Sequence, residues 1–264
     1  YAKMLSDWWG GVYWFSSCGT IGYMKIAVLT IAYNESQWIG ACVKQFKPFG
    51  FHHLVLVSSL PWNGEPVEDD GTVNGARNNG AETIVQYWPT EAEQRNWGLA
   101  RLYDYDYVLI VDADELYTQA DISRIKNTLY NEVCYRVSNM VTYWKTPKYV
   151  FDPPDKHKPI IAVNPKVIKF SEHRMVRHVA EKPMWQLQLF IDVTLHHMSW
   201  VKSDKKVEEK IQSFSHADQI RSDWYEKVWK EWLPGSQMMI RPYGHEKSKA
   251  KHQEAPDEIK RYAY

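Results

Sequence analysis

The 264-residue chain has no excess of charge and no long apolar run. Its 32 basic residues are matched by 32 acidic ones, so the formal net charge is zero. A neutral composition gives no general electrostatic reason to expect nucleic acid or an anionic membrane as a partner, although a local basic patch stays open. No window holds the roughly 18 apolar residues of a membrane-spanning helix, so we expect no transmembrane span.

Cysteine is also scarce. Cys18, Cys42 and Cys134 are far apart, odd in number and without the spacing of metal ligands. This usage favours a reduced, cytoplasmic protein, with a peripheral contact to a membrane left open. Residues 1–23 are aromatic but lack the charged start and uninterrupted apolar middle of a signal peptide. We interpret them as an N-terminal extension, a packing arm or an artefact, and the sequence does not choose among these.

Aromatic side chains, in contrast, are abundant, with 13 Trp and 17 Tyr. Aromatic rings stack on sugars and bases at binding surfaces, but they more often fill protein cores. We therefore expect core packing for most of them.

Apolar segments alternate with helical patterns in the first half of the chain. The predicted strands are residues 24–33, 52–59, 81–88 and 107–113, and the predicted helices are residues 34–46, 90–103 and 121–130. Thr90 begins the second helix, with Glu93 in the capping-box position. Residues 60–80 are dense in Gly, Asn and Asp, which predicts a long loop. The order predicts an α/β fold with a mostly parallel central sheet flanked by helices, and ligands at the carboxyl ends of the strands.

The stretch "YVLIVDADELY" carries an apolar strand straight into Asp112, Asp114 and Glu115. Carboxylates at the end of a buried strand suit a divalent cation, because Mg²⁺ and Mn²⁺ prefer hard oxygen ligands and often bridge to nucleotide phosphates. The alternative is that these acids cap the next helix or lie in solvent.

At this motif the sequence resembles a known family. "VLIVDADE" following "KIAVLTIAYNE" is similar to the family 2 glycosyltransferases with the Rossmann-like GT-A fold, over residues 24–130 and more loosely over 195–217. The resemblance implies a nucleotide-sugar-binding half at residues 24–130 and an acceptor-side half of the same domain at residues 131–202. The helical periodicity and the charges of residues 203–264 predict C-terminal helices and a charged tail.

The resemblance also implies roles for individual residues. It assigns Asn34 and Glu35 to the nucleotide pocket, Arg95 to a phosphate, Asp112 to the sugar or ribose, and Glu115 to support. For the divalent cation, Mn²⁺ or Mg²⁺, the implied ligands are Asp112, Asp114 and one late histidine, His197. Adjacent residues on a strand point opposite ways, so at most one of His196 and His197 should reach the site.

Two features depart from the family pattern. The second strand of the family ends in an acid that reads the base, whereas this strand offers only Ser58 and Ser59 there, so Ser58 is the candidate for the nucleotide pocket. Asp69 and Asp70, further along the loop, are substitutes for the acid or lie in solvent. No clean acidic pair marks the catalytic base that an inverting transferase needs. Glu172, Glu181 and Asp192 are candidates, with Glu181 placed best between basic and aromatic residues, and a surface ion pair is its alternative role.

The sequence therefore predicts a metal-dependent glycosyltransferase. The resemblance implies a UDP- or GDP-sugar donor and a glycan, lipid-linked or other hydroxyl acceptor. Three alternatives stay open: a phosphatase-type metal-dependent hydrolase, a non-catalytic nucleotide-sugar binder, and transfer to a nucleic-acid base, against which the neutral charge argues.

Overall fold

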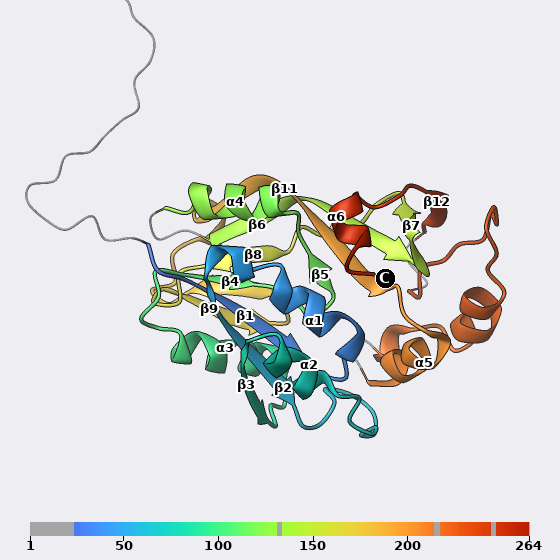
Figure 1. Cartoon of the computed structure of the whole chain (residues 1–264), viewed down its shortest axis with the longest axis horizontal. Helices are drawn as coiled ribbons and strands as arrows, with labels where there is room; N and C mark the ends of the chain where they lie inside the picture. Colours follow the sequence, from blue (N-terminus) through green and yellow to red (C-terminus); the bar gives the residue numbers. More distant parts are fainter. Residues whose placement is uncertain (1–23, 131–133, 214–216, 244–246, 264) are drawn as a thin grey trace, which may run out of the picture.

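The computed structural model describes residues 24–130, 134–213, 217–243 and 247–263. The predicted N-terminal extension and Cys18 lie outside these ranges. Four parallel strands form one half of a ten-stranded sheet, in the order β3-β2-β1-β4 (Figure 1). They are β1 (Ile26–Ala32), β2 (His52–Ser58), β3 (Glu82–Gln86) and β4 (Tyr107–Ile110). Every residue of β1 and β4 is buried, as expected of strands covered on both faces.

Helices connect these strands and cover them. The three helices are α1 (Ser36–Lys44), α2 (Thr72–Asn78) and α3 (Glu91–Arg101). The predicted cap of α3 is confirmed, because the Glu93 backbone N–H donates to Thr90 Oγ1 at 3.2 Å. Helix α2 lies in the segment predicted to be a loop. Its Gly and Asn residues are poor helix formers, but burial of Ala76 in one cluster with Ile39 of α1 outweighs that preference.

The other half of the sheet is more mixed. Strand β8 (Ile160–Val163) lies antiparallel between β4 and β6 (Cys134–Trp144), and β6 pairs in parallel with the long strand β11 (Gln188–Trp200). The remaining strands are β5 (Glu115–Leu116), β7 (Thr146–Asp152) and β12 (Lys249–His252) in the same sheet, and the hairpin of β9 (Ile168–Glu172) with β10 (Met175–His178). The predicted α/β class, with a mostly parallel central sheet flanked by helices, is confirmed.

A cluster of tryptophans joins the C-terminal segment to the sheet. The segment contains α5 (Asp204–Ser213), the π-helix η4 (Tyr225–Lys230) and α6 (Asp257–Lys260). Buried in one cluster are Trp144, Trp200, Trp224, Trp229 and Trp232. For these residues the expectation of core packing is confirmed. The shorter remaining elements are η1 (Lys47–Phe49), α4 (Gln119–Thr128), η2 (Met184–Gln186) and η3 (Ala217–Gln219).

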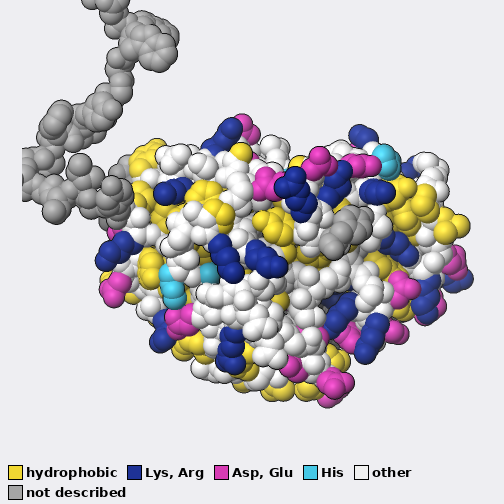
Figure 2. All heavy atoms as spheres, viewed as in Figure 1, with side chains coloured by type: hydrophobic (Ala, Val, Ile, Leu, Met, Phe, Trp, Pro, Cys, Tyr) yellow, Lys and Arg dark blue, Asp and Glu magenta, His cyan; other side chains and the backbone are white. Residues whose placement is uncertain are grey.

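The surface agrees with the neutral composition. On the face shown in Figure 2, basic and acidic side chains are interspersed rather than gathered by sign. Among the described residues, no helix is long and apolar enough to cross a membrane.

Candidate active site

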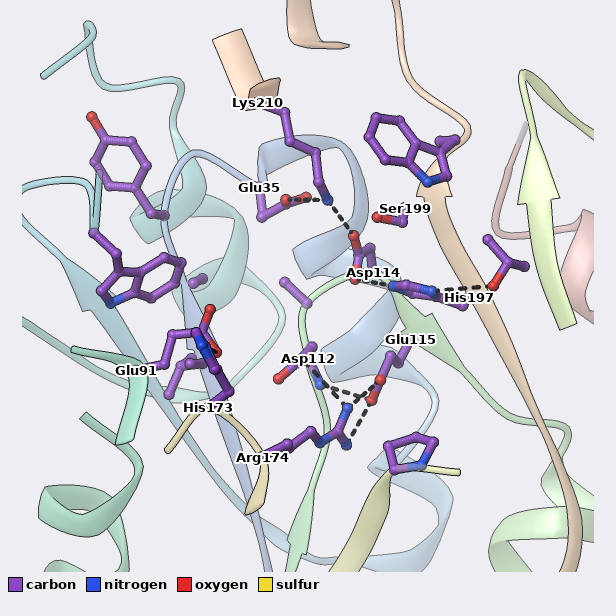
Figure 3. A pocket seen from close by; sticks show the side chains of 18 of the residues that line it. Glu35, Glu91, Asp112, Asp114, Glu115, His173, Arg174, His197, Ser199 and Lys210 are labelled. Atoms are coloured by element: carbon purple, nitrogen blue, oxygen red, sulfur yellow. Dashed lines mark hydrogen bonds and ion pairs between the residues drawn. The ribbon is translucent and has the colours of Figure 1, made fainter. Parts of the chain in front are cut away.

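A cavity of about 580 Å³ lies where β1 and β4 end (Figure 3). Its walls come from the residues after β1 and β4, from α3, from the β9–β10 turn, from the end of β11 and from α5. Pockets for small ligands and cofactors commonly measure about 300–1,000 Å³. The carboxyl ends of parallel strands are also the usual binding edge of such sheets. The cavity is therefore the candidate active site.

Asp112 lies on the cavity floor between two arginines. Its Oδ1 accepts from Arg95 Nη2 at 2.9 Å, and its Oδ2 accepts from Arg174 Nη1 at 3.3 Å. Burial alone would raise the pKa of Asp112, but the charges of Arg174 and Arg95 and the Arg95 hydrogen bond hold it below its usual range. The side chain is still 31% exposed, so this ionised carboxylate faces the cavity in a fixed orientation.

Glu115 holds the backbone at Asp112 and the side chain of Arg174 in place. Its carboxylate is 2% exposed and accepts two hydrogen bonds from the guanidinium of Arg174, one of them at 3.0 Å. It also accepts from the Asp112 backbone N–H at 3.0 Å, and Arg174 Nη2 donates to the Ile110 carbonyl at 2.7 Å. The Arg174–Glu115 pair thus ties the β9–β10 turn to the end of β4.

Asp114 belongs to a separate group of charges. Lys210 Nζ of α5 lies 3.0 Å from Asp114 Oδ2, and His197 Nε2 lies 3.5 Å from Oδ1. Burial would raise the pKa of Asp114, but the Lys210 and His197 charges hold it well below its usual range. Asp114 is therefore a buried carboxylate that is already neutralised by side chains of the protein.

The turn after β1 contributes the next carboxylate. Glu35 accepts a short hydrogen bond from buried Lys202 and lies 3.7 Å from Lys210 Nζ. Asn34 lines the cavity with a positive φ of 50°, and its Nδ2 donates to the Glu68 carbonyl at 2.9 Å. Asn34 therefore holds the 60–71 loop against the first strand, while Glu35 takes part in a lysine-carboxylate network.

The adjacent side chains of His196 and His197 point in opposite directions. His197 faces Asp114, and its Nδ1 lies 3.5 Å from Thr142 Oγ1. Burial would lower the pKa of His197, but the charge of Asp114 and the hydrogen bond to it raise that pKa. His196 points away from the cavity into the core, where its Nδ1 lies 2.8 Å from the Tyr143 hydroxyl.

His196 makes the stability depend on pH. Burial lowers the pKa of His196 from 6.5 to about 4. Between these pH values the imidazole is protonated in the unfolded chain but neutral in the folded protein. The contribution of His196 to the free energy of unfolding is complete above pH 6.5 and falls by about 1.4 kcal/mol for each pH unit between 6.5 and the lower pKa. We expect the stability difference between wild type and His196→Gln to shrink as the pH falls from 7 to 5. Urea unfolding at both pH values measures this, and an unchanged difference would contradict it.

Several predicted site residues lie elsewhere. Ser58 is buried and donates to the Leu60 carbonyl at 2.6 Å, and it does not line the cavity. Glu181 is exposed in the turn after β10, and the 81% exposed carboxylate of Asp192 pairs with Arg124 at 3.3 Å. Neither acid lines the cavity, so nothing in their positions supports a role as catalytic base. Arg95 does line it, but its guanidinium is buried against Glu91 and Asp112.

The substitutes for a base-reading acid are also placed outside the cavity lining. Asp70 accepts from the Ser36 and Thr72 backbone N–H groups, both at 3.0 Å, and pairs with Lys206 at 2.8 Å. Burial would raise the pKa of Asp70, but the hydrogen bonds from Lys206, from the Thr72 hydroxyl and from Ser36 lower it to about 2. Asp70 thus fastens α2 and α5 to the start of α1 instead of facing a ligand.

Sequence analysis named Arg95 but missed Arg174 and three lysines that also line the cavity. Arg174 belongs to no sequence motif, and its role depends on the β9–β10 hairpin folding over β4. Lys202, Lys206 and Lys210 did carry a signal, since they recur every fourth residue and so share one side of the α5 region. That periodicity indicates a basic face, but it does not indicate which acids the face meets.

The predicted metal ligands do not fit a divalent cation as they are arranged. Within the described ranges, no group of three or more His, Cys, Asp or Glu side chains is placed to hold a metal ion. Both oxygens of Asp112 face arginines, and Asp114 shares its oxygens between Lys210 and His197. A metal on Asp114 would have to share that carboxylate with the Lys210 ammonium group.

Comparisons with known proteins give only weak structural matches. No protein-family model and no curated protein matches the sequence. The inositol-1-phosphate CTP transferase from T. maritima is 10% identical, with a TM-score of 0.39 over 71% of this chain and 95% of that one. The glycosyltransferase GlyE of Streptococcus pneumoniae TIGR4 is 13% identical, with a TM-score of 0.30 over 54% of this chain and 35% of that one.

A third match is a Bacillus anthracis protein in complex with sucrose, assigned as a glucose-1-phosphate thymidylyltransferase. It is 11% identical, with a TM-score of 0.33 over 90% of this chain and 94% of that one. The matched structures are thus nucleotidyltransferases and a glycosyltransferase. At these identities and TM-scores, their activities cannot be transferred to this chain.

Proposed function

We propose that this protein is a glycosyltransferase that moves a sugar from a nucleotide-sugar donor to a hydroxyl acceptor. The observation that carries the proposal is the cavity at the ends of β1 and β4, where the acids of the D-x-D motif, Asp112-Ala113-Asp114, meet the basic face of α5. A nucleotide-sugar needs both, because its diphosphate is anionic and its hydroxyls are hydrogen-bond donors. UDP- and GDP-sugars are the donors that we expect first.

The donor side of the site uses the first half of the chain. Asp112 keeps an ionised carboxylate facing the cavity, and its oxygens have lone pairs left to accept from ribose or sugar hydroxyls. The Trp62 ring lines the same cavity and offers a face on which a base or sugar can stack. Lys206 and Lys210 lie on the wall formed by α5, where they can meet the diphosphate.

Glu172 is the catalytic base in this proposal. Each other carboxylate that lines the cavity pairs with a lysine or arginine, whose N–H groups occupy its oxygens and compete with an acceptor hydroxyl for them. These paired carboxylates are Glu35, Glu91, Asp112, Asp114, Glu115, Asp155 and Glu209. Glu172 differs from these acids, because in the described ion pairs its partner is His173, at 3.9 Å, and not a lysine or arginine. The Glu172 side chain is 63% exposed. It is therefore free to take the proton of an acceptor hydroxyl.

A thermal-shift screen tests the donor directly. The protein is melted with UDP-, GDP-, CMP- and dTDP-sugars, each in EDTA and in Mn²⁺. We expect one donor to raise the melting temperature by about 5 °C or more, because a ligand at 100 times its Kd adds about 2.7 kcal/mol and 1 kcal/mol is worth about 2–4 °C in a chain of this size.

Other outcomes would replace the proposal. Absence of any shift together with absence of nucleoside diphosphate release refutes it. Phosphate release from p-nitrophenyl phosphate without a sugar nucleotide would identify a hydrolase instead. Donor binding without transfer or slow donor hydrolysis would identify a non-catalytic binder.

A further inference from the structure

We propose that Lys210 supplies the positive charge at the donor diphosphate that sequence analysis assigned to a divalent cation, and that the reaction needs no metal. This inference rests on the glycosyl transfer proposed above. The ammonium group of Lys210 lies beside the carboxylates of Asp114 and Glu35 (Figure 3).

Lys210 is held in place from two sides. Its Nζ lies 3.0 Å from Asp114 Oδ2 and 3.7 Å from Glu35 Oε1, and the side chain is only 15% exposed. The ammonium group also lies 5.9 Å from the centre of the Trp200 ring. The two carboxylates and the ring thus hold the ammonium group in one position at the cavity wall.

The carboxylates around Lys210 are also balanced by lysines of the protein. Lys202 is buried and bonded to Glu35, and Lys206 pairs with Glu209 at 3.0 Å. Lys202, Lys206 and Lys210 all line the cavity. Each carboxylate beside them is therefore compensated before any ion is added. A divalent ion on Asp114 and His197 would meet the like charge of Lys210 on the same carboxylate, which opposes its binding.

The transfer step then balances without a metal. The bond between the anomeric carbon and the β-phosphate oxygen breaks, and its electron pair stays on that oxygen. The acceptor hydroxyl oxygen forms the new bond to the anomeric carbon, and its proton goes to Glu172. The ammonium group of Lys210 donates a hydrogen bond to the leaving diphosphate as its charge grows, which is where a fixed cation lowers the barrier most.

Calorimetric titration of UDP and GDP in EDTA tests this inference. We expect one of them to bind the wild type in EDTA, with a Kd that Mn²⁺ changes by less than about threefold. Lys210→Met should weaken that binding about 10- to 100-fold, the usual worth of a hydrogen bond to a charged group. Lys210→Arg should retain most of the affinity. Lys205→Met, on the same helix but 83% exposed, is the matched control and should bind like the wild type.

A second readout uses Mn²⁺ alone. In Lys210→Met the carboxylate of Asp114 loses its ammonium partner and stays beside His197, so Mn²⁺ should raise the melting temperature of this variant but not of the wild type. If Lys210→Met does not fold, the comparison of EDTA with Mn²⁺ in the wild type still decides, because it needs no variant.

The outcomes separate this inference from the proposed function. Nucleotide-sugar turnover by the wild type that EDTA abolishes and Mn²⁺ restores would overturn the role of Lys210 and leave glycosyl transfer standing. Unchanged nucleotide affinity in Lys210→Met would do the same. Failure of both nucleoside diphosphates to bind, with no turnover of any donor, would overturn both.

Discussion

Replacing Arg174 with methionine should lower the free energy of unfolding by about 3–5 kcal/mol, the usual cost of removing one partner of a buried ion pair. The substitution leaves Glu115, which is 2% exposed, as an unpaired buried carboxylate. It also removes the donor to the Ile110 carbonyl and one of the two partners of Asp112. Urea denaturation at pH 7 measures the loss.

Two further variants show whether the guanidinium group is responsible. Arg174→Lys keeps the charge but cannot reproduce the two-pronged hydrogen bond to Glu115, so its loss should be intermediate. Arg177→Met removes an exposed arginine from neighbouring β10 and should change stability by about 0.5 kcal/mol or less. Equal stability of Arg174→Met and Arg177→Met would show that the Arg174–Glu115 pair does not hold the floor of the site.

Replacing Glu172 with glutamine should lower kcat by about 10²- to 10⁴-fold, the usual contribution of a general base. The amide keeps the size of the side chain but cannot accept the acceptor's proton. Because the side chain is 63% exposed, the fold should be unaffected, and donor affinity should change little. Steady-state kinetics with the donor found by the screen, together with a melting curve, measures both effects.

Glu181→Gln is the matched control for this base. Sequence analysis favoured Glu181, whereas the structure places it outside the cavity lining. We expect wild-type kcat for Glu181→Gln. The reverse result, an inactive Glu181→Gln beside an active Glu172→Gln, would return the base to the residue that the sequence favoured.

Local patterns were enough to predict the first half of the fold. The apolar runs of β1, β2 and β4 identify strands buried on both faces, and the cap at Thr90 identifies the start of α3. The acids after β4 therefore could be placed at the carboxyl edge of a parallel sheet. Helix α2 could not be predicted, because its stability comes from packing against α1 and not from its own residues.

The partners of the acids could not be predicted, because long-range contacts decide them. Arg174 lies 59 positions from Glu115, and Lys210 lies 96 positions from Asp114. A carboxylate beside a guanidinium or an ammonium group and a carboxylate that binds a metal look the same in the sequence. The Asp112-Ala113-Asp114 motif thus predicted acids at the edge of the sheet where the candidate cavity lies, but not which charges they meet.

The most direct test of glycosyl transfer is to identify what the protein releases from the donor that stabilises it. Mass spectrometry of the reaction should find the nucleoside diphosphate, with the sugar on an acceptor hydroxyl or on water, and Glu172→Gln should release it far more slowly. Formation of pyrophosphate from a nucleoside triphosphate and a sugar phosphate would identify nucleotidyl transfer instead. That result, or the absence of any product, would contradict the proposal.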